Sequence, residues 1–126
     1  MAKILVIEDD PQSARLVERV LLREGHEVLQ ASEGITGLNI AAKESVDLVL
    51  LDLGLPDIGG HTIAALINRI PGDIPIIAVT GSTDEATQRR AMSYGCDGYI
   101  TKPIDTRAFP EQIGEFLHPN GNGSGS

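Results

Sequence analysis

Acidic side chains follow two apolar runs that lie far apart in the chain. Glu8 and Asp9 come directly after residues 4–7, and Asp52 comes directly after residues 48–51. Acids beside a loop are usually just solvated, but three carboxylates brought together repel one another, which raises their pKa values and destabilises the folded protein. A divalent cation removes that cost, and carboxylates, a backbone carbonyl and waters are the ligands that Mg²⁺ prefers. The pattern therefore indicates a Mg²⁺ site if the fold brings the two segments together.

A hydroxyl and an ammonium group also follow or end apolar runs, as the three acids do. Thr80 precedes Gly81 at the end of a third apolar run, and Lys102 precedes Pro103 after a weaker one. Each alone is more often an ordinary strand-end hydroxyl or a solvated charge. Together with the acids they would supply metal ligands, a carboxylate nucleophile, and a hydroxyl and a cation for phosphoryl oxygens. That is the apparatus of phosphoryl transfer to an aspartate.

The elements that must position these side chains are strands that alternate with helices. Residues 4–7, 48–51 and 76–79 are apolar throughout, which is typical of parallel strands buried on both faces. Residues 27–31 and 97–101 are weaker candidates that complete a set of five.

Helical spacing fills the intervals between the strands. Asp10 can cap the first helix, with Pro11 at its first helical position and Gly25 where it stops. Pro110 cannot lie deep inside a helix, so residues 105–109 are expected as an irregular turn and the last helix is expected to begin at Pro110. The other helices are expected at approximately residues 34–43, 59–69 and 84–93.

This alternation predicts a doubly wound α/β fold, with a flavodoxin-like, five-stranded parallel sheet in the order 2-1-3-4-5 and right-handed crossovers. In such folds ligands bind beyond the carboxyl ends of the strands, at the switch point between the first and third strands. Glu8, Asp9 and Asp52 would meet there, with Thr80 and Lys102 beside them. The fold thus predicts one site from distant segments.

The overall composition fits one globular domain and narrows its partners. The chain has 126 residues, 41% of them hydrophobic, and a formal net charge of -8. An acidic surface repels nucleic acid and anionic lipid, so direct binding to nucleic acid or a membrane is not expected. The single cysteine, Cys96, excludes an internal disulfide, and no run is long enough for a signal peptide or a membrane span, which favours the cytoplasm. Residues 1–118 are expected to form the domain, and residues 119–126 a flexible natural tail, a truncated linker or a cloning remnant.

These residues together resemble a known family. The chain is similar to the receiver domain of two-component response regulators, in particular to single-domain, chemotaxis-regulator-like members. The resemblance covers residues 3–118, and the segments 52–57 and 98–103 are also typical of that family. It rests on the side chains at the predicted strand ends, which are Glu8-Asp9, Asp52, Thr80 and Lys102-Pro103.

The resemblance implies a phosphorelay function. Asp52 would accept a phosphoryl group from a phosphohistidine of a sensor histidine kinase or a histidine phosphotransfer protein, or from acetyl phosphate. Mg²⁺, for which Mn²⁺ can substitute, would be held by the side chains of Glu8, Asp9 and Asp52 and by the backbone carbonyl of Gly54. Glu8 stands where many members have aspartate, and its longer side chain is expected to reach the metal through water. The chain would promote its own phosphorylation and dephosphorylation without being a conventional enzyme.

The resemblance also implies a conformational switch. Lys102 would pair with the phosphoryl oxygens, and its peptide bond to Pro103 would be cis. Thr80 would move toward the phosphoryl group and Tyr99 would swing inward, which changes the surface of the fourth helix, fifth strand and fifth helix. A downstream protein would bind this surface, and whether a homodimer also forms there is left open.

Three other interpretations share the architecture or the site. A flavin-binding module would need a Ser/Thr/Gly-rich phosphate loop where this chain has Glu8-Asp9-Asp10, and a haloacid-dehalogenase-type phosphatase would have two aspartates two residues apart after the first strand. A receiver-like interaction domain that is never phosphorylated is the third. Within the receiver interpretation, a stand-alone regulator is the main expectation and a receiver excised from a longer regulator or hybrid kinase is the alternative. Gly54 and Ser82 are small at positions that tune dephosphorylation in this family, so the site is expected to be open to water and to a partner.

Overall fold

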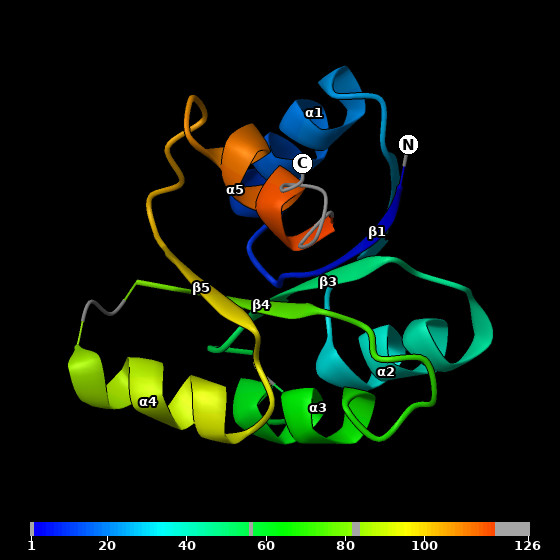
Figure 1. Ribbon diagram of the computed structural model, residues 1–126, viewed down its shortest axis with the longest axis vertical. Coiled ribbons are helices and arrows are strands. Elements are labelled where there is room, and N and C mark those ends of the chain that lie inside the picture. The colour runs from blue at the N-terminus through cyan, green and yellow to red at the C-terminus, as the bar shows by residue number, and fades with distance from the viewer. Residues whose placement is uncertain (1, 56, 82–83, 118–126) are drawn as a thin grey trace.

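The computed structural model of the chain describes residues 2–55, 57–81 and 84–117. These residues form strands and helices in strict alternation (Figure 1). In chain order the elements are β1 (Lys3–Ile7), α1 (Pro11–Arg23), β2 (Glu27–Ala31), α2 (Gly34–Lys43), β3 (Leu48–Asp52), α3 (Gly60–Ile67), β4 (Ile76–Thr80), α4 (Glu85–Ser93), β5 (Gly98–Thr101) and α5 (Phe109–Leu117).

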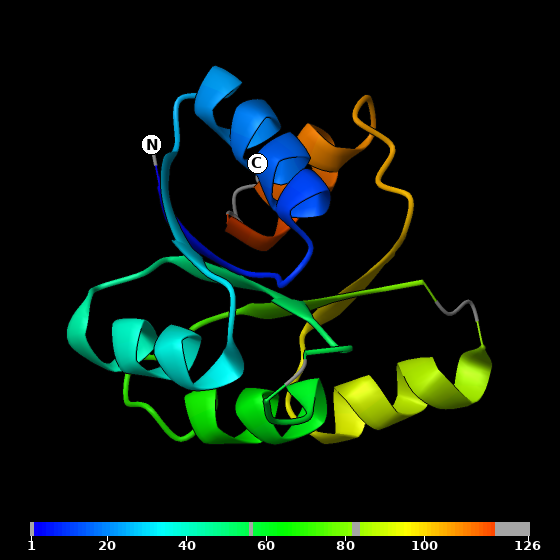
Figure 2. The ribbon, with the colours of Figure 1, turned by 180° about the vertical axis from the view of Figure 1, so that it is seen from behind.

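The strands form one parallel sheet between two layers of helices. Their order is β2-β1-β3-β4-β5, and every pairing is parallel. The helices α1 and α5 cover one face of the sheet, and α2, α3 and α4 cover the other (Figure 1, Figure 2). The predicted flavodoxin-like fold and strand order are confirmed. None of the helices in the described ranges is long and apolar enough to cross a membrane.

Each central strand contributes to two hydrophobic cores because its side chains alternate between the faces of the sheet. Ile4 and Val6 of β1 are buried in the cluster that includes α1 and α5, whereas Leu5 and Ile7 join the cluster that includes α2 and α3. All residues of β3, including Asp52, are buried. Burial on both faces explains why these strands are apolar throughout, and their parallel pairing places their carboxyl ends at one edge of the sheet.

The start of α1 shows the capping that the sequence predicts. The Asp10 side chain accepts a hydrogen bond from the Gln12 N–H at 3.2 Å and another from the Ser13 hydroxyl at 3.0 Å. Pro11 is the first residue of the helix, and Gly25, beyond its end, has a φ of 88°. Asp10 is therefore occupied as a helix cap, unlike the two acids that precede it.

Three helices differ from the prediction at their ends, and α4 does so by one residue, because Asp84 is its N-cap. α3 is shorter than the predicted 59–69, because residues 69 and 70 donate hydrogen bonds to carbonyls three residues back and so form a turn. The predicted start of α5 at Pro110 is wrong by one residue. Phe109 is fully buried and begins the helix, and Pro110 occupies the first turn, where its missing N–H leaves no helical hydrogen bond unmade.

The start of α3 packs on the backbone of the segment that follows β3. A Cβ atom at Gly60 would lie 2.5 Å from the Leu53 Cα and 2.9 Å from the Asp52 carbonyl oxygen. A Cβ atom at the neighbouring Gly59 would have no heavy atom within 4 Å. The close approach at Gly60 therefore requires a residue without a side chain, which lets the start of α3 lie against the end of β3.

Alanine should be tolerated at one of these glycines and not at the other. Gly60→Ala should lower the free energy of unfolding by roughly 1–3 kcal/mol, because the new methyl group meets backbone atoms that cannot rotate away. Gly59→Ala is the matched control and should change it by less than about 0.5 kcal/mol. Urea denaturation of both variants measures the difference. Equal effects would show that the contact with the end of β3 is not the cause.

Candidate functional site

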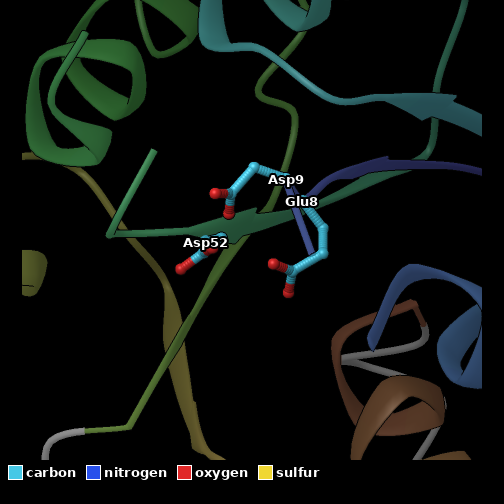
Figure 3. A group of neighbouring side chains, drawn as sticks. All are labelled: Glu8, Asp9 and Asp52. Atoms are coloured by element: carbon cyan, nitrogen blue, oxygen red, sulfur yellow. The ribbon is translucent and has the colours of Figure 1, made fainter. Parts of the chain in front are cut away.

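Three carboxylates from two neighbouring strands meet at the carboxyl edge of the sheet. Ile7 of β1 pairs with Leu51 of β3, so Glu8 and Asp52, each one residue further on, leave the sheet side by side. Glu8, Asp9 and Asp52 each offer a carboxylate oxygen, and these oxygens all lie within 4.8 Å of one another (Figure 3). The structure thus brings together acids that the sequence placed at two separate strand ends.

Two of these carboxylates are buried. The exposed fractions of Glu8 and Asp52 are 7% and 8%, and they are the buried charged residues among those that the structure describes. Asp9 is exposed. Burying a charge is costly unless hydrogen bonds, an opposite charge or a metal compensates it. The site must therefore contain, or recruit, a compensating positive charge.

The crowding of the carboxylates changes their acidity. Burial raises the pKa of Asp52, and the neighbouring Glu8 carboxyl raises it further. The pKa of Asp9 is raised mainly by a hydrogen bond with Asp52, to which loss of some hydration and repulsion by Asp52 add. Both shifts mean that the folded protein disfavours the state in which all the carboxylates are ionised. An all-oxygen donor set of this charge fits Mg²⁺, which would relieve the repulsion.

Lys102 brings a counter-charge from the end of β5. Its Nζ lies 2.9 Å from Glu8 Oε1 and 3.7 Å from Asp52 Oδ2. Burial acts to lower the pKa of Lys102, but the contacts with Glu8 and Asp52 outweigh it, so the pKa lies above its ordinary value. The sequence indicated that Lys102 approaches the acids, but it did not indicate that Glu8 is the nearer partner. That choice depends on where each side chain points, which residue spacing does not encode.

The two oxygens of Asp52 have different surroundings. Oδ1 accepts a hydrogen bond from the Gly54 N–H at 3.0 Å, whereas Oδ2 faces Lys102. Glu8 is held in a similar way, since its Oε2 accepts the Asp10 N–H at 3.2 Å. The resemblance to receiver domains implied a role for the Gly54 carbonyl but not for this N–H. The signal was available, because an aspartate side chain commonly accepts the backbone N–H two residues further along the chain.

The other predicted residues lie on the neighbouring strands. Thr80 is the half-buried last residue of β4, and its carbonyl accepts the Lys102 N–H at 2.8 Å. Tyr99 of β5 is half-buried and packs against the core cluster on the side of α2 and α3. The Lys102–Pro103 peptide bond is cis. Ser82, which was expected near the site, lies outside the described residues.

Known proteins share this sequence pattern. Residues 4–114 match the family described as the response regulator receiver domain. The response regulator ArlR of Staphylococcus saprophyticus is 40% identical over 117 residues, which cover 93% of this chain and 53% of ArlR. The chain thus spans about half the length of the curated relatives it matches.

Solved structures share the fold. A CheY-like response regulator receiver domain protein from Methanospirillum hungatei has a TM-score of 0.90 at 29% identity, covering 97% of this chain and 98% of that one. The receiver domain of the sensor histidine kinase PA1611 from Pseudomonas aeruginosa, which has a magnesium ion in its active-site cleft, has a TM-score of 0.84 at 24% identity, covering 92% of this chain and 97% of that one. Because the family match spans most of the chain and a curated relative is 40% identical, the chain belongs to the receiver domains of two-component response regulators, which act in phosphorelays.

Proposed function

We propose that this receiver domain accepts a phosphoryl group on Asp52 in a Mg²⁺-dependent reaction. The donor is a phosphohistidine of a sensor histidine kinase or of a histidine phosphotransfer protein, with acetyl phosphate as a small alternative. The observation that carries the proposal is the convergence of Glu8, Asp9 and Asp52 within 4.8 Å, with the Lys102 ammonium beside them. A buried carboxylate flanked by acids and one ammonium is suited to a dianionic phosphoryl group only when a metal accompanies it.

The carboxylates of Asp9 and Asp52 and the carbonyl of Gly54 would hold the metal, with Glu8 contributing through water. When bound, Mg²⁺ neutralises the crowded carboxylates and binds phosphoryl oxygens. Mn²⁺ accepts the same oxygen donors and should substitute for it. The raised pKa values of Asp52 and Asp9 support this proposal, because they reflect a repulsion that a cation relieves.

Asp52 would act as the nucleophile. One of its oxygens attacks phosphorus, the bond from phosphorus to the donor imidazole nitrogen breaks, and the electron pair of that bond stays on the nitrogen. The Gly54 N–H fixes the orientation of the Asp52 carboxylate. Lys102 would exchange its contact with Glu8 for phosphoryl oxygens, a short movement because its Nζ already lies 3.7 Å from Asp52 Oδ2.

Phosphorylation would then be transmitted through Thr80 and Tyr99. Thr80 would donate its hydroxyl to a phosphoryl oxygen, and Tyr99 would move inward into the vacated space. The neighbouring helix α4 is weakly anchored, since Ala91 is its one buried residue, so a small change in packing beneath it is enough to move it. We propose that a downstream protein binds the face formed by α4, β5 and α5, and that any homodimer would use the same face.

We also propose the boundaries of the domain, the kind of protein to which it belongs and where it works. The proposed domain comprises residues 1–118; residue 118 and the proposed flexible tail, 119–126, lie outside the described residues. Relatives named as transcriptional or DNA-binding regulators are covered to 53% and 49% of their length, so a receiver of a longer regulator is the second candidate beside a stand-alone one. With a net charge of -8, this chain itself should not contact nucleic acid or anionic membranes. It would work in the cytoplasm, promoting its own phosphorylation and dephosphorylation without being a conventional enzyme.

Removing one crowded charge should stabilise the protein in the absence of Mg²⁺. Because the pKa of Asp52 is raised in the folded state, its ionisation costs stability once the pH rises above the ordinary value of 3.8. Asp52→Asn should therefore raise the free energy of unfolding by about 1 kcal/mol at neutral pH. The gain should shrink as the pH falls toward 3.8. Urea denaturation in a chelating buffer measures it, and a less stable variant would contradict the crowding argument.

Mg²⁺ should raise the midpoint of thermal unfolding, because the carboxylates are brought together only in the folded state. At a concentration about 100 times its dissociation constant, the ion should stabilise the wild type by about 2.7 kcal/mol. Asp9→Asn should reduce this shift strongly. Asp73→Asn changes an exposed carboxylate before β4, at the opposite edge of the sheet, and should leave the shift unchanged. Calorimetric melting of the three proteins tests the metal site, and equal shifts in all of them would place the ion elsewhere.

Incubation with acetyl phosphate and Mg²⁺ should add one phosphoryl group to the chain. Intact-mass measurement should detect it in the wild type and in Asp73→Asn, and should not detect it in Asp52→Asn. A gain that survives Asp52→Asn would move the acceptor to another residue. No gain in the wild type from acetyl phosphate or from a phosphohistidine donor would favour the receiver-like interaction domain that is never phosphorylated.

A further inference from the structure

Asp57, for which the sequence suggested no role, links the loop after β3 to the start of α2. Its Oδ1 accepts the Gly34 N–H at 2.9 Å, and its Oδ2 accepts the Ile35 N–H at 3.1 Å. Gly34 and Ile35 are the first two residues of α2, which lies beside α3 (Figure 2). A carboxylate from the β3–α3 loop therefore caps a helix that precedes it by more than twenty residues.

The start of α2 depends on this distant cap. Glu33 occupies the N-cap position of α2 in an extended conformation, but its side chain makes no capping hydrogen bond. The first N–H groups of a helix have no partner within the helix, so an external acceptor is needed. Asp57 meets this need with both oxygens, and the Gly34 N–H, followed by the Ile35 N–H, lowers the pKa of Asp57 and keeps it ionised at the positive end of the helix dipole.

Packing reinforces the same link. A Cβ atom at Gly34 would lie 2.7 Å from the Ile58 Cγ2 and 2.8 Å from the Ile63 Cγ1, so the loop residue after Asp57 presses directly on the start of α2. Further along, Gly60 packs on the backbone of Leu53 and Asp52. Among the described residues of this segment, Leu53 donates its N–H to the Val79 carbonyl, Leu55 is buried in the core on the side of α2 and α3, and Ile58 and Gly60 make the contacts just described.

Gly54 lies between Leu53 and the buried Leu55. It is exposed, and its contact with the site is the hydrogen bond from its N–H to Asp52 Oδ1 at 3.0 Å. Its carbonyl is also one of the proposed metal ligands. A glycine in an exposed loop has large conformational freedom, so its position depends on how firmly the flanking residues are held.

We propose that Asp57 is a positioning residue for the phosphorylation site, because its hydrogen bonds to the start of α2 hold the loop that places Gly54 beside Asp52. The role rests on the proposed Mg²⁺-dependent function of that site, to which it adds a residue that contacts neither the metal nor the phosphoryl group. Releasing the loop should loosen the Gly54 N–H contact and weaken Mg²⁺ binding. Interactions that orient metal ligands from outside the coordination sphere commonly affect affinity by about tenfold or more.

The test uses three variants of the whole chain. Asp57→Ala removes both hydrogen bonds and the charge, whereas Asp57→Asn removes the charge but keeps one acceptor oxygen. Asp97→Ala is the matched control, because Asp97 is also an exposed carboxylate that accepts a backbone N–H from another element, the Ile76 N–H at 2.9 Å, at the opposite edge of the sheet. Thermal unfolding first establishes that each variant is folded.

Two measurements separate positioning from simple helix capping. The Mg²⁺ dissociation constant, from calorimetric titration, should rise roughly tenfold in Asp57→Ala and clearly less in Asp57→Asn, and should stay unchanged in Asp97→Ala even if that variant is less stable. Amide hydrogen exchange without Mg²⁺ should accelerate at Gly34, Ile35 and Gly54 in Asp57→Ala. Acceleration at Gly34 and Ile35 alone would mean that Asp57 only caps α2, and would overturn the inference.

Two other results of the Mg²⁺ titrations would also decide between the explanations. Equal loss of Mg²⁺ affinity in Asp57→Ala and Asp57→Asn would show that charge, and not the hydrogen bonds, is responsible, which would overturn the inference. A wild type that binds no Mg²⁺ would instead refute the proposed function. In that case the exchange rate of the Gly54 amide still decides whether Asp57 holds the loop.

Discussion

Repulsion among carboxylates at one edge of the sheet is the constraint on which the rest of the structure depends. Glu8 and Asp52 are buried side by side, Asp9 lies within reach of both, and the pKa values of Asp52 and Asp9 are raised as a result. Lys102 offsets part of the negative charge through its contact with Glu8. Because one ammonium cannot balance all these acids, a further cation would relieve the repulsion that remains.

The packed cores on both faces of the sheet oppose this repulsion. The strands that end in these acids are buried on both faces, one core lying beneath α1 and α5 and the other beneath α2, α3 and α4. The absence of a side chain at Gly60 lets the start of α3 lie directly against the backbone of Leu53 and Asp52. Burial of the apolar cores therefore stabilises the fold enough to offset the repulsion among the carboxylates. This arrangement is common where function requires an unfavourable cluster of charges.

The parts of the site that could be predicted are those that depend on strand order alone. Once the strands are placed as 2-1-3-4-5, the residues after β1 and β3 must be neighbours, so the meeting of Glu8 and Asp52 required no knowledge of side-chain conformations. The contact between Lys102 and Glu8 could not be predicted in this way, because a lysine side chain reaches several acids at this edge. The start of α5 was also predicted wrongly, because the prediction used the position of Pro110. The helix begins one residue earlier, at Phe109, whose burial in the core depends on how α5 packs.

The sequence by itself determined the alternation of strands and helices, the burial of the central strands, the cap at Asp10 and the set of residue types at the strand ends. These features depend on local periodicity and on the chemistry of neighbouring residues. Only the tertiary structure decided that Asp57 caps α2 and that Glu8 is the nearer partner of Lys102. Each of these contacts joins groups whose distance is set by how whole elements pack, and packing is a property of the complete chain that no local pattern contains.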